Sequence, residues 1–274
     1  MRKKQKSVIL FFLIFTIGVQ CKEKKEPTLP IPPVPQVEWS VSQKGNILEI
    51  AYGSEGNYPQ YAALHLNDSY FRLVYGPESN WGTSIILLPS FWERGKLYQG
   101  AAVSYSYQVT GSDLMIFISG YISSLNVNVQ IQISPPADNS ISAQITVSLS
   151  GDINLDDRPG EAFKLVTFSS MHISSNTWDC CYAYADSSHF SIPTEGWIIQ
   201  PPVSGNIFGL EGGTSSWKNN APTTEVQIDR NVRITGWVTS STNQSNDNVG
   251  FWGAADHLVR SWSYKLISRS AGGK

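Results

Sequence analysis

The chain has 274 residues, of which 41% are hydrophobic and 15% charged, and its formal net charge is −2. Seven of its 20 lysines and arginines lie in residues 1–36, so the rest of the chain is mildly acidic. This balance argues against nucleic acid as a partner, because proteins that bind nucleic acid present a basic face to the phosphates. Neutral glycans and other uncharged partners remain compatible with it.

The first 20 residues have the pattern of an export signal. Four positive charges within residues 1–6 precede an almost wholly apolar stretch from Ser7 to Val19. These match the basic and hydrophobic regions of a signal peptide, and the apolar stretch is short for a helix that spans a bilayer. Cys21 follows, and a charged run occupies residues 22–26.

This arrangement resembles the signal peptides of bacterial lipoproteins, in which a cysteine after the hydrophobic region is lipidated and becomes the mature N-terminus. The resemblance covers about the first 25 residues, and Gln20 departs from the small residues that the family prefers before the cysteine. It implies that residues 1–20 are removed and that Cys21 carries acyl chains such as palmitate. The partner would be the lipid bilayer, with the protein on the cell surface or the periplasmic face. The alternative is a plain secretory or anchoring segment in which Cys21 is an ordinary thiol.

Residues 21–36 are predicted to be a tether, and residues 37–274 a single domain. Five prolines between Pro27 and Pro35 favour extended polyproline II and cannot build a core. No break in composition divides the rest, whose length suits one large β domain. Its two cysteines, Cys180 and Cys181, are adjacent and give no disulfide framework. We expect one buried and one exposed thiol, with a strained vicinal disulfide as the alternative.

Apolar and polar residues alternate with a period of two through this domain, between breaks rich in Gly, Pro, Asn, Asp and Ser. Residues 125–133 and 141–149 alternate most strictly, and their polar positions are Asn, Gln, Ser and Thr. The link 135–139 predicts a hairpin turn between them. One face should pack on the core while the other meets water or a ligand. Further strands are predicted at residues 46–52, 62–66, 70–75, 84–88, 101–109, 114–119, 163–174, 178–185, 196–199, 225–229, 232–239 and 258–267.

The fold class predicted from these strands is all-β, because no helical pattern of useful length occurs in the domain. The expected architecture is a single large antiparallel two-sheet sandwich, either a supersandwich or a jelly roll. At the level of fold only, such a domain resembles the β-sandwich and supersandwich proteins that bind or process sugars. No motif residue carries this likeness, and fold alone does not imply function.

The densest polar cluster lies within residues 152–161. Asp152, Asn154 and Asp156 alternate as the oxygen ligands of a calcium loop do, but the glycine of the sharp turn and the acid at the twelfth position are missing. A solvated turn is the alternative, and a third interpretation places Arg158 and Glu161 at the rim of a ligand cleft. Apart from this candidate Ca²⁺ site, no cofactor is expected.

Nine tryptophans are many for this length, and several stand beside glycine, amide or charged residues. Aromatic rings pack on the C–H faces of sugars, while neighbouring amides and charges bind the hydroxyl groups. Core packing is the alternative role for most of them. The candidate ligand-binding residues are Trp92, Arg94, Trp178, Trp217, Lys218 and Trp252.

Acid–base chemistry has four candidates: His172, His257, Arg158 and Glu161. A catalytic acid or base must reach the substrate by a hydrogen bond, and residues from separate strands of a sandwich can do so without a compact motif. The alternative is that the histidines are structural.

Three functions therefore stay open. The first is a carbohydrate-interacting lipoprotein. The second is a sugar-processing enzyme, either a lyase or a glycosidase, on the same fold. The third is a structural or adhesive surface lipoprotein with no small-molecule site.

Overall fold

The structure is a computed structural model of the whole chain. It describes residues 37–54, 60–66, 70–73, 81–86, 90–93, 96–122, 124–138, 140–151, 163–172, 182–191, 193, 195–211, 223–239, 247–255 and 259–269. Contacts divide the chain between Val34 and Pro35, and every described strand belongs to the second unit. Among these residues, no helix has the length and apolar character needed to cross a membrane.

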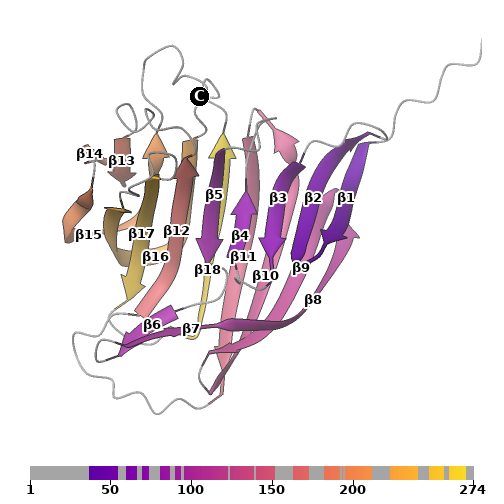
Figure 1. The fold of residues 1–274 in the computed structure, drawn as a ribbon, viewed down its shortest axis with the longest axis horizontal. Helices are drawn as coiled ribbons and strands as arrows, with labels where there is room; N and C mark the ends of the chain where they lie inside the picture. The colour runs from indigo at the N-terminus through magenta and orange to yellow at the C-terminus, as the bar shows by residue number, and fades with distance from the viewer. Residues whose placement is uncertain are drawn as a thin grey trace, which may run out of the picture. The chain divides into compact units, whose positions relative to one another are not determined.

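The described part of the chain consists almost entirely of strands (Figure 1). The strands are β1 (Val37–Lys44), β2 (Ile47–Ser54), β3 (Gln60–His65), β4 (Tyr70–Leu73), β5 (Trp81–Ile86), β6 (Ser90–Glu93), β7 (Lys96–Gln99), β8 (Ala101–Thr110), β9 (Asp113–Ile122), β10 (Leu125–Ala137), β11 (Ser140–Ser150), β12 (Phe163–His172), β13 (Tyr182–Ala185), β14 (Ser188–Ser191), β15 (Gly196–Glu211), β16 (Thr223–Thr239), β17 (Asp247–Ala255) and β18 (Ser261–Arg269).

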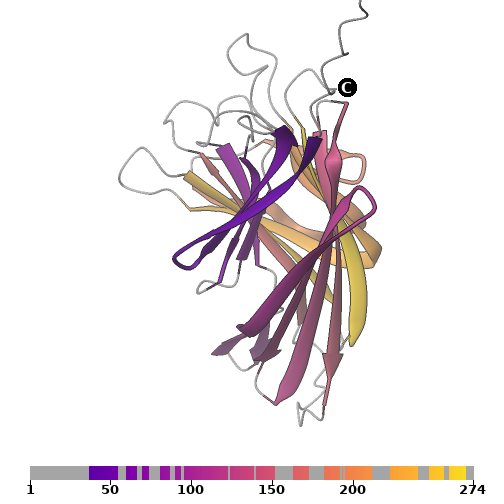
Figure 2. The same cartoon turned by 90° about the vertical axis from the view of Figure 1, so that its right-hand side faces the viewer.

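These strands form two antiparallel layers. In the first layer, β1 to β5 pair in chain order, and β5 is followed by β12, β17 and β16; the β6–β7 hairpin pairs with β12. The second layer runs β8, β9, β10, β11, β18 and β16, and continues through β15 to β13 and β14. Figure 2 shows the two layers side by side. The predicted all-β, two-sheet antiparallel sandwich is confirmed.

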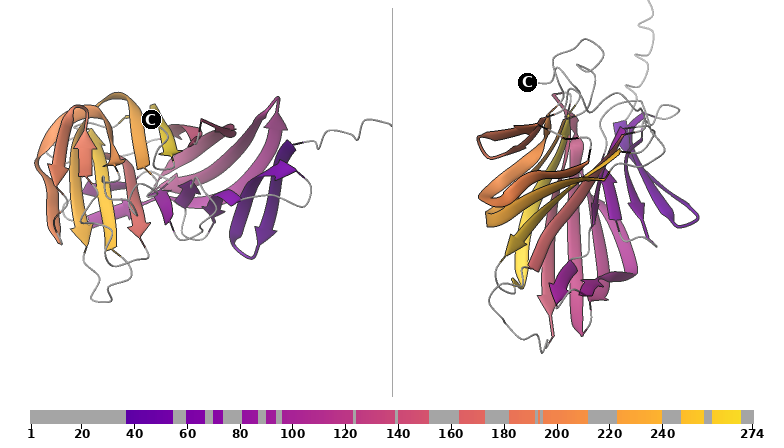
Figure 3. Two further views of the ribbon diagram at one scale, coloured as in Figure 1. Left: turned by 90° about the horizontal axis from the view of Figure 1, so that it is seen from above. Right: turned by 60° about the vertical axis from the view of Figure 1, so that its left-hand side comes forward.

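The long hairpin β15–β16 belongs to both layers and joins them. Residues 223–228 of β16 pair with β18 in the second layer, whereas residues 233–239 pair with β17 in the first. In Figure 3 this orange hairpin lies at one side of the domain. Asp186 fixes the bulge of β15, because its Oδ1 accepts hydrogen bonds from the backbone N–H groups of Asn206 and Ile207 at 3.2 and 3.0 Å.

The core lies between the layers and follows from the alternation in β10 and β11. In β10, buried residues at 125, 127, 129, 131 and 133 alternate with exposed or half-buried ones. The register places Ile131 opposite Ile145, and Ile145 opposite Tyr264, so one buried row crosses three strands. Phe71 and Leu73 of β4 are fully buried against the same core, over β11 and β18.

Several expectations about the strands were wrong in detail. Residues 225–229 and 232–239 are one strand, β16, because the chain stays extended while it passes from one layer to the other. The link after residue 133 is not a plain turn, because β10 continues through a register shift to Ala137. Five strands were not predicted: β1, β6, β7, β14 and β17.

Strand β17 escaped prediction because its sequence, DNVGFWGAA, is rich in glycine and alanine. The packing explains this composition at Gly253. A Cβ atom there would lie 3.0 Å from both Ile228 Cδ1 and Val232 Cγ2 of β16. A larger side chain would therefore collide with the neighbouring strand, and Val249 is the single β-branched residue in a strand otherwise interrupted by glycine.

Candidate functional site

The outward side of β10 and β11 carries a grid of uncharged polar side chains. The register pairs Asn126 with Ser150, Asn128 with Ser148, Gln130 with Thr146 and Gln132 with Gln144. These residues are exposed or half-buried, whereas their neighbours in sequence are buried. We call these eight residues the amide–hydroxyl face.

The neighbouring strands extend the amide–hydroxyl face in the same chemistry. On β9, Ser119 lies opposite Asn128, and its hydroxyl is 3.2 Å from Asn128 Oδ1. On β18, Ser261 lies opposite Ser148 and Ser263 opposite Thr146. A row of amides and hydroxyls therefore runs across four adjacent strands of the second layer.

Two exposed aromatic residues border the amide–hydroxyl face on β9. Phe117 is opposite Gln130 and 36% exposed, and Tyr121 is opposite Asn126 and 52% exposed. Both stand in the outward phase of the strand, four residues apart, which is about 13 Å along an extended chain. Ser119 lies between them, so the two rings flank a polar position at one margin of the face.

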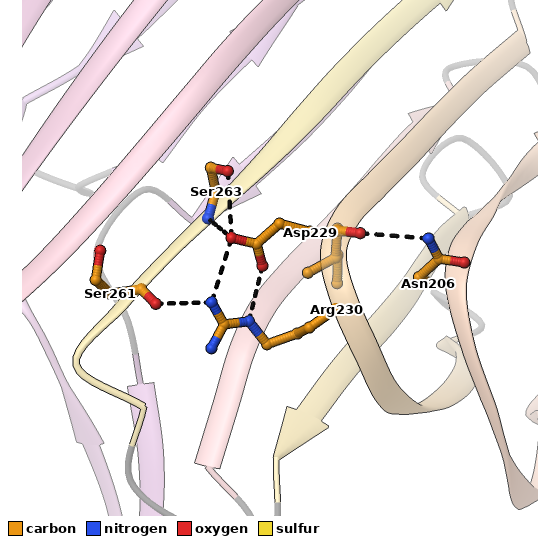
Figure 4. Close-up of polar contacts among 6 residues, drawn as sticks. Asn206, Asp229, Arg230, Ser261 and Ser263 are labelled. Atoms are coloured by element: carbon orange, nitrogen blue, oxygen red, sulfur yellow. Dashed lines mark hydrogen bonds and ion pairs between the residues drawn. The ribbon is translucent and has the colours of Figure 1, made fainter.

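A charged pair borders the face on the other side, where β16 meets β18 (Figure 4). The Asp229 carboxylate accepts hydrogen bonds from Arg230 Nε at 2.7 Å and from the backbone N–H of Ser263 at 2.8 Å. Arg230 Nη2 donates to the backbone oxygen of Ser261 at 2.8 Å. Arg230 and Asp229 thus neutralise each other and tie two strands together.

Beyond this pair, Glu225 is held by two neighbours. Its carboxylate accepts hydrogen bonds from the Tyr184 hydroxyl at 2.8 Å and from Gln227 Nε2 at 2.7 Å. Lys265 stands in register between Gln144 and Gln227. Charge therefore reaches one end of the amide–hydroxyl face, where Lys265 stands opposite Gln144 and Gln132 Nε2 donates to the Asp113 carboxylate. The eight residues of the face are themselves uncharged.

Two buried polar groups lie beneath this side of the sheet. Trp262 Nε1 and the Tyr264 hydroxyl have no hydrogen-bond partner among the described residues. Burial raises the pKa of Tyr264 far above its usual value of 10. The phenol therefore stays protonated at neutral pH.

The chemistry available on the amide–hydroxyl face is hydrogen bonding to uncharged groups. Amides both donate and accept hydrogen bonds, as do hydroxyls, whereas neither binds a hard cation as well as clustered carboxylates do. In the described ranges, no group of three or more His, Cys, Asp or Glu could hold a metal ion. The face suits a neutral ligand with many hydroxyl groups.

Most residues singled out from the sequence lie outside the described residues. These are Cys21, Arg94, Asp152, Asn154, Asp156, Arg158, Glu161, Trp178, Cys180, Cys181, Trp217, Lys218 and His257.

The backbone positions of Trp92, Trp252 and His172 are described. Trp92 lies on β6 and Trp252 on β17, and these two strands flank β12 on opposite sides. His172 ends β12, where the register pairs it with Trp81 of β5 and with Asp247 of β17. A histidine and an aspartate thus occupy neighbouring register positions at one end of the first layer.

The aromatic border of the face was missed, although the sequence holds a signal for it. Phe117 stands between Ile116 and Ile118, so it is an apolar residue in the outward phase of a predicted strand. An aromatic residue that breaks the alternation on the solvent side is a candidate for ligand contact.

No family model matches the chain, and no curated protein sequence matches it. Among solved structures, a putative aldose 1-epimerase from Escherichia coli K12 matches 86% of this chain and 99% of its own, with 7% identity and a TM-score of 0.39. The Slr1438 protein from Synechocystis sp. PCC 6803 matches 90% of this chain and 99% of its own, with 9% identity and a TM-score of 0.41.

A third similar structure is the 4-alpha-glucanotransferase from Thermococcus litoralis, with 10% identity and a TM-score of 0.40. The match covers 85% of this chain but 40% of the glucanotransferase. All three similarities have TM-scores below 0.5, so no property of this chain is concluded from them.

The contacts of Asp229 predict how the free energy of unfolding depends on pH. Partial burial raises the pKa of Asp229, but the hydrogen bonds from Arg230 and Ser263 outweigh it and leave the pKa below 3.8. The carboxylate therefore contributes fully to the free energy of unfolding above the ordinary pKa of an aspartate. This contribution is lost as the pH falls through the lowered pKa of the folded state. Asp229→Asn should lower the free energy of unfolding at pH 7 by at most about 1 kcal/mol, since the group is partly exposed.

Urea unfolding of both proteins over a range of pH measures this difference, which should vanish in strong acid. An equal difference at every pH would contradict the role given to the carboxylate charge.

Proposed function

We propose that this protein is exported, anchored to a bacterial membrane by acyl chains on Cys21, and binds a neutral glycan through the amide–hydroxyl face. The observation that carries the proposal is the chemistry of that face. Eight outward positions on two adjacent strands hold amides and hydroxyls without a single charge, beside two exposed aromatic rings.

An ordinary solvated sheet face would have a different composition. Charged residues make up 15% of this chain and stand mostly on the surface, which predicts at least about one charge among eight exposed positions. The face has none, although the domain as a whole is acidic. This contrast favours a surface that contacts an uncharged partner over one that only meets water.

A glycan suits the face because a sugar combines polar hydroxyl groups with apolar C–H faces. Sugar hydroxyls donate and accept hydrogen bonds as side-chain amides do, and the C–H faces of sugar rings pack on aromatic rings. The two border residues, about 13 Å apart along β9, would contact separate rings of an oligosaccharide. A single monosaccharide would reach only one of them.

The binding proposal predicts that Phe117→Ala weakens glycan binding about tenfold, because the ring loses apolar contact with the sugar. Gln130→Ala, on the opposite strand, should weaken it as well. Trp197→Ala is the matched control, since Trp197 is 48% exposed but lies on the part of β15 that pairs with residues 234–238. A glycan array followed by titration with the best ligand measures all four proteins.

Two results would count against binding at this face. The first is a wild-type protein that binds no plant or microbial polysaccharide, which favours a structural or adhesive role. The second is a loss of binding in Trp197→Ala that equals the loss in Phe117→Ala.

A second candidate function is a sugar-processing enzyme, and the register around His172 favours it. Its place beside Asp247 and Trp81 brings together residue types that acid–base catalysis on sugars uses. Chromatography of the glycan after incubation separates the two functions. A shortened or modified glycan would indicate processing, and an intact one would indicate binding alone.

Lipidation at Cys21 can be tested by replacing this cysteine. Cys21→Ser removes the thiol that acylation needs, so the protein should leave the detergent phase and no longer incorporate a labelled fatty acid. Cys180→Ser is the control and should stay with the membrane fraction. Fractionation of cells that express each protein measures the outcome, and an unchanged membrane fraction for Cys21→Ser would contradict lipidation at this residue.

A further inference from the structure

Strand β8 forms one edge of the second layer. Nine of its ten residues pair with β9, the register shifts at Val103, and no other strand in the described part of the chain pairs with it. In an antiparallel sheet, about half of the residues of an edge strand direct their N–H and C=O groups away from the sheet. These groups form a template on which another strand can pair.

The sequence of β8, AAVSYSYQVT, contains no charge and no proline. Other edge strands among the described residues are protected. β1 carries Glu38 and Lys44, β7 begins with Lys96, and both β7 and β14 have four residues. Charged residues and short length are usual devices against pairing at an edge, and β8 has neither of them. Its one irregularity, the register shift at Val103, leaves the seven residues from Ser104 to Thr110 in continuous register.

Exposed apolar residues gather on the same hairpin. Of the seven large apolar side chains exposed in the described part of the chain, five lie on β8 and β9. Three belong to β8: Val103, Tyr107 and Val109, which are 69%, 47% and 57% exposed. Tyr107 and Val109 lie on the inward face, opposite Ile116 and Leu114, whereas Phe117 and Tyr121 lie on the outward face. The exposed residues of β8 are therefore the apolar side of the free edge, and exposed apolar residues that gather in this way mark a contact surface.

Two hydrogen bonds from neighbouring parts of the same chain fix this edge. The Trp39 indole of β1 donates a hydrogen bond to the backbone oxygen of Ser112 at 2.7 Å. The Tyr105 hydroxyl donates to Gln43 Oε1 of β1 at 2.8 Å. Figure 2 looks onto this side of the domain. A fixed strand pairs with less loss of conformational entropy than a flexible one.

We propose that β8 pairs antiparallel with β8 of a second copy of this chain, around a twofold axis perpendicular to the second layer. In such a pair, each residue of one copy lies opposite a residue of the other copy whose side chain points to the same face of the joined sheet. Tyr105 and Tyr107 of one copy would then meet the same apolar row of the other, and Ser104 and Ser106 would meet the outward polar row. The amide–hydroxyl faces of the two copies would join into one surface.

The occupant is a second copy because the strand complements itself. Around a twofold axis, any charge near the centre of β8 would face its own like charge, which destabilises a strand pair. The absence of charge from all ten residues removes this repulsion. A strand from a different acidic or basic partner would find no opposite charge on β8 to select it.

The test is the oligomeric state of the full-length protein in detergent, measured by light scattering and sedimentation at micromolar concentration. The wild-type protein should have twice the mass of one chain. With the twofold axis at Ser106, Ser106→Lys places two like charges opposite each other across the pair and should raise the dissociation constant about tenfold or more. Ser119→Lys is the matched control, because it adds the same charge to the same face on the neighbouring strand β9.

A melting temperature close to wild type shows that each variant is folded. A monomeric wild-type protein would overturn the proposal. A Ser106→Lys variant that dimerises as tightly as Ser119→Lys would also overturn it, since pairing would then use another surface. Neither outcome depends on whether the protein binds a glycan.

Discussion

The register between β10, β11 and β18 decides both the core and the outward surface of this domain. Ile131, Ile145 and Tyr264 form a buried row across these strands, and the adjacent row is Gln130, Thr146 and Ser263. Because side chains alternate with a period of two, a slip of one residue would exchange the two rows. The apolar core and the amide–hydroxyl face are therefore two results of the same pairing.

The long hairpin β15–β16 adds a second constraint, because it connects the layers. One half of β16 pairs with β18 and the other half with β17. Asp229 and Arg230 lie between the two halves, and their contacts to β18 tie the strand down where it changes layers. The same contacts neutralise the charges that border the uncharged face, so one local arrangement serves both stability and the chemistry of the surface.

The strongest sequence patterns predicted the structure well, and the weaker ones failed for identifiable reasons. The alternation in residues 125–133 and 141–149 predicted β10, β11 and their burial, because both strands have one face on the core. The run Asp229–Arg230–Asn231 has the composition of a turn, yet it lies within β16, between the part that pairs with β18 and the part that pairs with β17. The sequence did not predict β17, because packing requires glycine at position 253 and glycine does not favour a strand.

The candidate site was predicted only in part. The uncharged polar phase of β10 and β11 was visible in the sequence as a surface for water or a ligand. Its aromatic border depends on how β9 pairs with β10, and a single strand read alone does not give that register. The tryptophans proposed as ligand contacts stay a prediction, since the described strands fix only the backbone positions of Trp92 and Trp252.

The most direct test of this account compares Ile145→Ala with Gln144→Ala by urea unfolding. The two residues are adjacent on β11, but Ile145 is fully buried and Gln144 is exposed. Ile145→Ala should lower the free energy of unfolding by about 2 to 4 kcal/mol through the lost apolar contacts and the cavity, and Gln144→Ala should change it by less than about 0.5 kcal/mol. Equal losses in the two variants, or a larger loss in Gln144→Ala, would contradict the register on which the core and the amide–hydroxyl face both rest.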